Sequence, residues 1–434
     1  MRMQDLIEKK KNGFSHAREE LEYIVRGAVD GSVPDYQLSA WLMAVCFRGM
    51  SDGELADLTE LMARSGDTVD LSALGDRTVD KHSTGGVGDK TTLIIAPLVA
   101  SQGGIVAKMS GRGLGFTGGT IDKLESVPGF RTELSDAQFI RALSEIGVCI
   151  AGQSGNLTPA DKKLYALRDV TATVDSMPLI ASSVMSKKLA TGAKSIVLDV
   201  KTGNGAFMKD VESASLLAEK MIAAGRAHGR NVRAVLTNMN IPLGNAVGNA
   251  LEVKEAVEVL SGKGPRDLRE ICLVLATQML ALSVGGDEAA LRRDCERALN
   301  DGTALGKFVE IVRAQGGDAS YITHPEQFPT AGTVYGVKAK KDGFIASMDC
   351  AVIGKTATLL GAGREKKGDL IDMSAGVTIL KKTGGFVQRG EIIAYLHTNR
   401  AEKLGEAEEL YLSALTLSDI PVEKEPLIYR MIQS

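Results

Sequence analysis

The chain has 434 residues, of which 44% are hydrophobic and 24% charged, a composition ordinary for a soluble globular protein of two or three domains. The formal net charge of −3 provides no general attraction to nucleic acid or to an acidic membrane surface. The longest apolar segment, residues 271–284, is interrupted by Thr277, Gln278 and Ser283. It is too short and too polar to span a bilayer, so we expect a buried helix there, and neither nucleic acid nor a membrane as a partner.

The cysteines give no sign of a disulfide framework or a zinc site. They are odd in number, and none stands in a Cys-x-x-Cys or Cys/His pattern: Cys46, Cys149, Cys272, Cys295 and Cys350. Residues 1–5 lack the apolar core of a secretory signal. We therefore expect a cytoplasmic protein.

Residues 1–70 are expected to form an all-helical domain. Several helical patterns follow one another, one of them with Pro34 in its first turn. The last begins with Ser51 and Glu54, which stand at the spacing of a capping box. This unit shows no chemistry of its own.

Residues 71–330 alternate between short apolar strands and helices. Strands are expected at 104–108, 148–151, 195–200 and 232–236, and helices at 91–100, 136–146 and 214–227. Such alternation predicts a mostly parallel sheet covered by helices, with ligands bound where the strands end. We expect an α/β domain over this range.

The sequence pattern changes again in residues 331–434, where short strands such as 334–337 and 377–380 are expected between glycine turns. The segment 382–391 resembles the turn of the barrel-sandwich hybrid of biotinyl and lipoyl carriers, but no lysine stands in a context that would carry a prosthetic group. We expect a β-rich C-terminal α+β domain that supports the structure or a dimer.

Two glycine-rich loops, residues 80–92 and 108–125, hold most of the chemistry. Both combine glycines with Ser, Thr and Lys. Glycines let the backbone approach a ligand and expose amide N–H groups, and the side chains add further donors. Because every one of these donors suits an oxyanion, we interpret the two loops as one phosphate cradle of the α/β domain.

Two familiar motifs are set aside. Residues 113–118 match the dinucleotide fingerprint formally, with Glu133 near the ribose-binding spacing, but they lie late in the chain within a longer polar loop. Residues 83–91 superficially resemble a P-loop, but Thr84 and Asp89 stand where that motif needs glycine. We expect neither a dinucleotide cofactor nor a Walker site.

The second glycine loop resembles a known family signature over a longer stretch than either of these motifs. Residues 110–125 resemble the signature of the thymidine/pyrimidine-nucleoside phosphorylase family. Further blocks in the family's order extend the resemblance over essentially the whole chain: 80–86, 152–157, 161–169 and 199–203.

This resemblance implies a homodimer whose subunit has a small helical lobe, joined by helices from about 160–190, and a larger α/β lobe. The active site would lie in the cleft between them, with hinge candidates at 66–67, 152–159 and 191–192. The implied reaction is reversible phosphorolysis, in which a pyrimidine nucleoside and inorganic phosphate give free base and (deoxy)ribose 1-phosphate. No organic cofactor is expected.

On the phosphate side, the resemblance assigns binding residues from both loops: Lys81, His82, Ser83, Thr92, Lys108, Met109, Ser110 and Thr120. Phosphate is both the nucleophile and a polyanion, so it needs several fixed donors. His82 is also a candidate general acid for the departing base, which is a hypothesis.

On the base side, the resemblance assigns Arg168, Ser183 and Lys187, of which Arg168 and Lys187 join His82 as catalytic candidates. The base leaves with negative charge, so donors must be aimed at that charge. Ser183 and Lys187 are four residues apart and therefore share one face of a helix.

Lys108 bears on the substrate range. The thymidine-specific branch of the family usually has an apolar residue near this position, whereas a lysine resembles the broader branch, which accepts uridine as well as thymidine. Phe116 stands where relatives commonly carry histidine, which would change the polarity near the ribose.

The resemblance also implies a potassium ion, held by groups of Gly88, residue 90, Leu243, Ala246 and Glu255. Relatives of the broad-specificity branch have threonine at position 90, whereas this chain has Lys90. The backbone carbonyl of Lys90 would still suit the ion, but its ammonium would reduce the need for one.

We expect a broad-specificity pyrimidine-nucleoside phosphorylase that acts on uridine, thymidine and deoxyuridine. Three alternatives stay open. A strict thymidine phosphorylase would not turn over uridine, a phosphoribosyltransferase of related fold would need magnesium and a pyrophosphate-bearing sugar, and a nucleoside-binding protein would show no turnover. The joint presence of Lys81, His82, Arg168, Ser183 and Lys187 argues against the last two.

Overall fold

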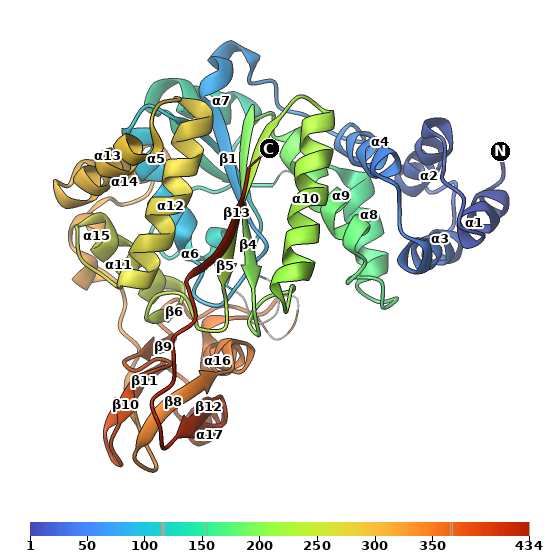
Figure 1. Ribbon diagram of the computed structural model, residues 1–434. Coiled ribbons are helices and arrows are strands. Elements are labelled where there is room, and N and C mark those ends of the chain that lie inside the picture. Colours follow the sequence, from blue (N-terminus) through green and yellow to red (C-terminus); the bar gives the residue numbers. More distant parts are fainter. Residues whose placement is uncertain (114–117, 154, 365, 367, 434) are drawn as a thin grey trace.

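The computed structural model describes residues 1–113, 118–153, 155–364, 366 and 368–433. A helical lobe lies to one side of an α/β lobe, and a β-rich domain lies below it (Figure 1). The predicted fold class, with a mostly parallel central sheet, is confirmed. Phe116 lies outside the described residues.

The helical lobe combines two distant parts of the chain. Its helices are α1 (Met3–Lys11), α2 (Arg18–Asp30), α3 (Asp35–Arg48), α4 (Asp52–Ala63), α8 (Pro159–Arg168) and α9 (Met177–Ala190). Leu164 of α8 and Leu179 of α9 are buried in one apolar cluster with Trp41 of α3. The predicted capping box is present, because the Glu54 N–H donates to Ser51 Oγ at 3.3 Å and the Ser51 N–H donates to Glu54 Oε2 at 2.9 Å.

The central sheet has the strand order β13-β5-β4-β1-β2-β3. Its strands are β1 (Thr78–Ser83), β2 (Ile105–Ser110), β3 (Val148–Gly152), β4 (Ser195–Thr202), β5 (Asn231–Asn238) and β13 (Ile428–Ile432). The first five are parallel, and β13 is antiparallel to β5. The carboxyl ends of β1 and β2 therefore meet at one edge, which brings the two glycine loops together.

Helices cover both faces of this sheet (Figure 1). One face packs on α5 (Thr91–Ser101), α11 (Asn249–Leu260), α12 (Arg266–Ser283), α13 (Glu288–Asn300) and α14 (Thr303–Ala314), and the other on α10 (Val211–Ala227), α4 and α9. Val197 of β4 belongs to the first core, whereas its neighbours Ile196 and Leu198 belong to the second. Because side chains alternate between the two faces of a strand and both faces are covered, every residue of β4 is buried.

Shorter elements complete the α/β lobe: η1 (Ser72–Arg77), α6 (Thr120–Leu124), α7 (Asp136–Ile146) and α15 (Ser320–Thr323). The apolar segment 271–284 lies in α12 up to the last helical residue, Ser283, as predicted, with Ile271 and Leu275 buried. Among the described residues, no helix combines the length and apolar character needed to cross a membrane.

The C-terminal domain contains two small sheets, β10-β8-β12 and β6-β9-β11-β7. Its elements are β7 (Thr333–Lys338), β8 (Gly343–Met348), α16 (Cys350–Ala357), β9 (Gly376–Ile379), β10 (Phe386–Val387), β11 (Ile392–Thr398), α17 (Leu404–Ser413) and β12 (Leu415–Ser418). The fourth strand of the second sheet, β6 (Ala246–Gly248), comes from the α/β part of the chain.

The partition at residues 330 and 331 therefore differs from the structure at two strands. β6 pairs with β9 of the C-terminal domain, and β13 returns from that domain to the central sheet (Figure 1). The physical reason is that β5 would otherwise leave a row of unpaired backbone groups at the sheet edge. Local sequence pattern carries no signal for which distant strand covers that edge.

Candidate active site

Two adjoining cavities lie between the carboxyl edge of the central sheet and the helical lobe. One, of about 380 Å³, is lined by both glycine loops, and the other, of about 200 Å³, by side chains of α8 and α9. The residues that line both are His82, Ser83, Thr84, Tyr165, Lys187 and Phe207. The arrangement offers a polar site for an oxyanion next to a less polar site for a ring.

The hydroxyl groups predicted to bind phosphate come together in the larger cavity. Ser83, Thr92, Ser110 and Thr120 all line it. Thr92 lies in the first turn of α5 and Thr120 opens α6, where unpaired backbone N–H groups add partial positive charge. Ser83 Oγ donates to Asp89 Oδ2 at 2.5 Å. Met109 lines the same cavity.

Lys81 lies beneath the cavity and does not line it. Its side chain is 2% exposed, and its ammonium donates to Thr91 Oγ1 at 2.5 Å. Oδ2 of Asp199 is 3.4 Å from the same nitrogen, and Oδ1 of Asp89 is 3.9 Å away. In this structure Lys81 supports the first loop from below.

Asp89 was missed as a site residue by the sequence interpretation. Burial alone would raise the pKa of its carboxyl group, but Lys81, Lys201 and Lys123 hold that pKa well below its usual value. The resulting carboxylate accepts from Ser83 Oγ and from Thr91 Oγ1, the latter at 2.6 Å. It orders the loop that a phosphate would contact. The available signal was an acidic residue within a glycine loop, two positions before Thr91.

Lys108 and Lys188 share Asp80 at the base of the site. Lys188 Nζ donates to Asp80 Oδ2 at 2.6 Å, and Lys108 Nζ is 3.6 Å from Asp80 Oδ1 and donates to the Lys81 carbonyl at 2.7 Å. Burial lowers the pKa of Lys108 to about 7, since the charges of Lys188 and Lys81 offset the attraction of Asp80. Lys108 is therefore close to a change of charge at neutral pH. Lys188, which the sequence interpretation missed, follows Lys187 directly.

His82 stands where the two cavities meet. Burial, followed by the charges of Lys188, Lys108, Lys187 and Lys81, lowers the pKa of its imidazole well below the ordinary value. The ring is thus neutral near pH 7. Within the parts of the chain that the structure describes, no group hydrogen-bonds to this ring, so its nitrogens are available to a ligand.

The base-side residues line the smaller cavity together. Arg168, Ser183 and Lys187 are all part of its wall. Lys187 Nζ donates to Ser183 Oγ at 3.0 Å, so the two share one face of α9, and it pairs with the carboxylate of Asp161 in α8. Asp161 is a partner that the sequence interpretation did not identify.

Arg168 is held by backbone carbonyls. Its Nε donates to Thr173 O at 3.1 Å, Nη1 to Leu179 O at 2.8 Å and Nη2 to Val174 O at 2.7 Å. A guanidinium has five N–H groups, so one remains on each terminal nitrogen. Burial lowers the pKa of Arg168. In this conformation it orders the turn before α9 and keeps two donors for a ligand.

The residues of the expected potassium site converge around a side chain of the protein. Lys90 Nζ donates to Leu243 O at 3.0 Å and to Ala246 O at 2.8 Å, and it pairs with the carboxylate of Glu255. A β-carbon added to Gly88 would press against the Leu243 carbonyl. The ammonium of Lys90 therefore lies among the oxygens that the ion would use, and this oxygen set does not fit an ion while Lys90 remains there.

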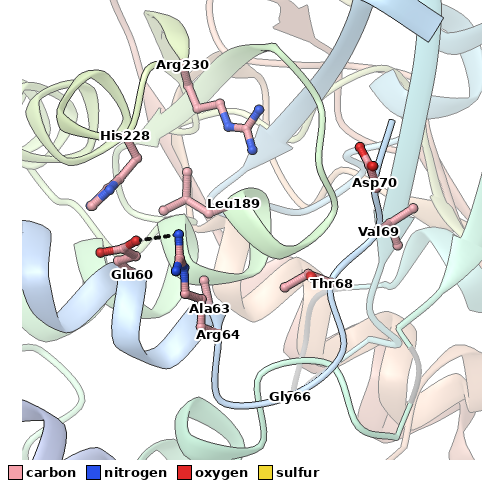
Figure 2. Close-up of a pocket in the computed structure, with 10 residues that line it drawn as sticks. All are labelled: Glu60, Ala63, Arg64, Gly66, Thr68, Val69, Asp70, Leu189, His228 and Arg230. Atoms are coloured by element: carbon pink, nitrogen blue, oxygen red, sulfur yellow. Dashed lines mark ion pairs between the residues drawn. The ribbon is translucent and has the colours of Figure 1, made fainter. Parts of the chain in front are cut away.

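The three hinge candidates meet at the connection between α4 and β1. The Asp67 N–H donates to Asn156 O at 3.1 Å, and the Val69 N–H donates to Ala190 O at 2.8 Å. A further cavity of about 670 Å³ opens beside this connection, with the ion pair of Glu60 and Arg64 on its wall (Figure 2). It shares no lining residue with the two cavities of the candidate site.

Comparison with known proteins covers all three parts of the chain. Residues 4–66 match the model of the glycosyl transferase family, helical bundle domain, and residues 75–305 match the glycosyl transferase family, a/b domain. Residues 344–418 match the pyrimidine nucleoside phosphorylase C-terminal domain.

Full-length relatives agree with these models. The chain is 51% identical over 433 residues to a pyrimidine-nucleoside phosphorylase of Geobacillus stearothermophilus, with 100% of both chains covered. It is 52% identical over 423 residues to a protein of the same name from Staphylococcus haemolyticus, with 96% of this chain and 98% of the relative covered. The crystal structure of anthranilate phosphoribosyltransferase from Thermus thermophilus is similar in fold, with a TM-score of 0.59 at 18% identity over 71% of this chain and 98% of that one.

Proposed function

This chain belongs to the pyrimidine-nucleoside phosphorylase family, and on that premise we propose that it catalyses the reversible phosphorolysis of pyrimidine nucleosides. The observation that carries the proposal is the pair of adjoining cavities that meet at His82. One is lined by hydroxyl groups and Lys108, and the other by Arg168 and Lys187. Phosphate in the first and base in the second would place the ribose between them.

The chemistry follows from what each cavity can donate. An oxygen of phosphate forms a bond to C1′ of the ribose as the bond from C1′ to the base nitrogen breaks, and the electron pair of that bond stays on the base. Donors that face the base oxygens stabilise this charge as it develops, which lowers the barrier. Lys187 and the two remaining N–H groups of Arg168 are suited to this role.

On the phosphate side the hydroxyls of Thr92, Ser110 and Thr120 hold the nucleophile in position, and Ser83 joins them when its hydroxyl turns from Asp89 to the anion. A hydrogen bond to a charged group contributes about 1.5–3 kcal/mol. Lys108, with its pKa of about 7, gains a full charge when a phosphate dianion binds, because the anion favours the protonated form. Fixing two reactants in one cleft supplies much of the remaining acceleration.

We propose broad specificity, with uridine, thymidine and deoxyuridine all accepted, supported by Lys108, which lies in β2 and lines the larger cavity. The second candidate is a strict thymidine phosphorylase, for which the tight, partly apolar base cavity would be the supporting feature. Assembly as a homodimer, a cytoplasmic location and the absence of an organic cofactor belong to the same proposal.

The test is phosphate-dependent release of free base from uridine, thymidine and deoxyuridine, measured side by side with the wild-type chain. Comparable release from uridine and thymidine supports broad specificity, and release from thymidine alone supports the narrower candidate. Release from none of them overturns the proposed function.

Two variants show whether the release belongs to this site. Lys187→Ala should abolish most of it, because Lys187 lines both cavities. Lys162→Ala is the matched control, since Lys162 is exposed on α8 beside Asp161 and should leave base release unchanged.

A further inference from the structure

We propose that the ammonium of Lys90 takes the place of the monovalent metal ion implied by the family resemblance, so that a side chain of the protein itself positions the phosphate loop. The proposal concerns this chain's own departure from the family at one position. The effect of Lys90 on turnover rests on the proposed function. The cage of oxygens around its ammonium, formed by Leu243 O, Ala246 O and the carboxylate of Glu255, can be tested without any reaction.

The ammonium of Lys90 is fully satisfied where it lies. A lysine ammonium has three N–H donors. It donates to Leu243 O at 3.0 Å and to Ala246 O at 2.8 Å, and its third partner is the carboxylate of Glu255. The side chain of Lys90 is fully buried. Two carbonyl oxygens and one carboxylate are the kind of oxygen set that binds a hard cation. Here they bind an ammonium, which carries the same single positive charge as a potassium ion.

The cage has no room for a second cation. A β-carbon at Gly244 would lie within 2.8 Å of Lys90 Nζ and would overlap the carboxylate of Glu255. The remaining oxygen of Glu255 accepts the N–H groups of Asn245 at 2.7 Å and Ala246 at 3.1 Å. A metal ion that used the same oxygens would stand against a like charge in a buried site, which is strongly unfavourable.

The charge of Lys90 is secure. Burial alone would lower the pKa of this ammonium, but the charges of Glu255 and Glu252 and the hydrogen bond to Glu255 raise it above the ordinary lysine value. The group is thus a protonated ammonium at neutral pH.

The position of Lys90 in the chain links the cage to the phosphate cavity. Lys90 precedes Thr91 and Thr92 at the start of α5 and follows Asp89, so its anchoring fixes the residues that order and line the phosphate cavity. The loop that supplies the carbonyls is held from the other side by Lys382 of the C-terminal domain, which donates to Pro242 O at 3.0 Å. Lys90 is a positioning residue that acts through this loop.

The experiment compares the wild-type chain with Lys90→Thr and Lys90→Met. Each is studied in potassium chloride and in choline chloride of equal ionic strength. The measurements are the melting temperature, the KM for phosphate and the turnover number. Rubidium bound per chain is measured separately by equilibrium dialysis and elemental analysis.

The wild-type chain should bind no rubidium at this site, and its melting temperature and KM should not differ between the two salts. Lys90→Thr opens the cage and supplies a hydroxyl. It should bind about one rubidium ion per chain, melt higher in potassium, and regain with potassium a KM for phosphate that has risen about tenfold or more without it. Lys90→Met, which fills the cage with an apolar chain, should not respond. Lys263→Thr, at an exposed lysine, is the control and should resemble wild type.

Saturable binding of one rubidium ion per wild-type chain, with a rise in melting temperature specific to potassium, would overturn the proposal. So would a folded Lys90→Thr that binds no ion. If Lys90→Thr does not fold in either salt, the wild-type dialysis and melting data decide alone. If no nucleoside is cleaved, the proposed function fails while the rubidium and melting measurements still judge the role of Lys90.

Discussion

Nζ of Lys188 in α9 donates to Oδ2 of Asp80 in β1 at 2.6 Å, and both side chains are almost completely buried. This ion pair joins a helix that closes the base cavity to the strand that leads into the phosphate loop. Lys188 also approaches the carbonyl of Met109 at 3.4 Å. One buried contact therefore ties together the nucleoside side and both glycine loops.

We predict that Lys188→Met destabilises the protein by about 3–5 kcal/mol, because it leaves the carboxylate of Asp80 buried with a weaker partner. The free energy of unfolding from urea titration measures this. The double variant Lys188→Met, Asp80→Asn should recover part of the loss, since it removes the uncompensated charge. A single variant as stable as wild type would contradict the buried pair.

Binding of an anion should depend on the protonation of Lys108. Sulfate, whose charge is constant above pH 5, should compete with phosphate less and less well as the pH rises through about 7, because Lys108 then loses its proton. In Lys108→Met the inhibition constant for sulfate should be higher and flat over the same range. Retention of the wild-type pH dependence in Lys108→Met would assign the titration to another group.

Lys108 should also affect how the free energy of unfolding depends on pH. The folded-state pKa of Lys108 lies below the unfolded-state value of about 10.4, so between these values the unfolded chain binds more protons. The contribution of Lys108 to the free energy of unfolding therefore rises as the pH increases from about 7 towards 10. Lys108→Met should remove that part of the slope, which urea titrations at several pH values can measure.

A neutral His82 predicts a particular order of variants. His82→Asn, which retains a neutral hydrogen-bonding side chain, should keep more turnover than His82→Ala, and both should bind phosphate nearly as wild type. Steady-state kinetics with the KM for phosphate measure this. Equal, severe losses in both variants would favour a proton donor instead, and unchanged turnover in His82→Ala would remove His82 from the mechanism.

Much of the fold follows from local pattern, but the site depends on distant contacts. The helix 136–146 was predicted with the bounds of α7, and the strand predicted at 104–108, before the second glycine loop, is β2 at Ile105–Ser110. The strand β1 before the first loop was not predicted. The four-residue spacing of Ser183 and Lys187 correctly put them on one face. Such features depend on residues that are close in sequence.

Other features could not be read from the chain in this way. The strand β13 covers the edge of β5 across almost two hundred residues of sequence, and no periodicity encodes that choice. Lys81 stands in a glycine-rich loop motif that predicts phosphate binding. In the structure its ammonium lies beneath the cavity, 3.4 Å from Asp199 Oδ2 on the neighbouring strand. Which charged partner a lysine finds depends on strand order and register, which only the folded chain reveals.

The hinge offers a matched pair of substitutions. Gly192 has a φ of +83°, and a β-carbon there would overlap the carbonyl of Val69, so Gly192→Ala forces apart two of the segments that join the lobes. Gly53 lies in the first turn of α4 with no atom near its added β-carbon, so Gly53→Ala is the control and should not lower the melting temperature. We expect Gly192→Ala to lower the melting temperature because of this overlap, and, on the hypothesis that the lobes close about this connection, to reduce the turnover number. Thermal melting and steady-state kinetics on both variants measure the difference. A Gly192→Ala chain that melts and turns over as Gly53→Ala does would show that the strained connection does not control closure.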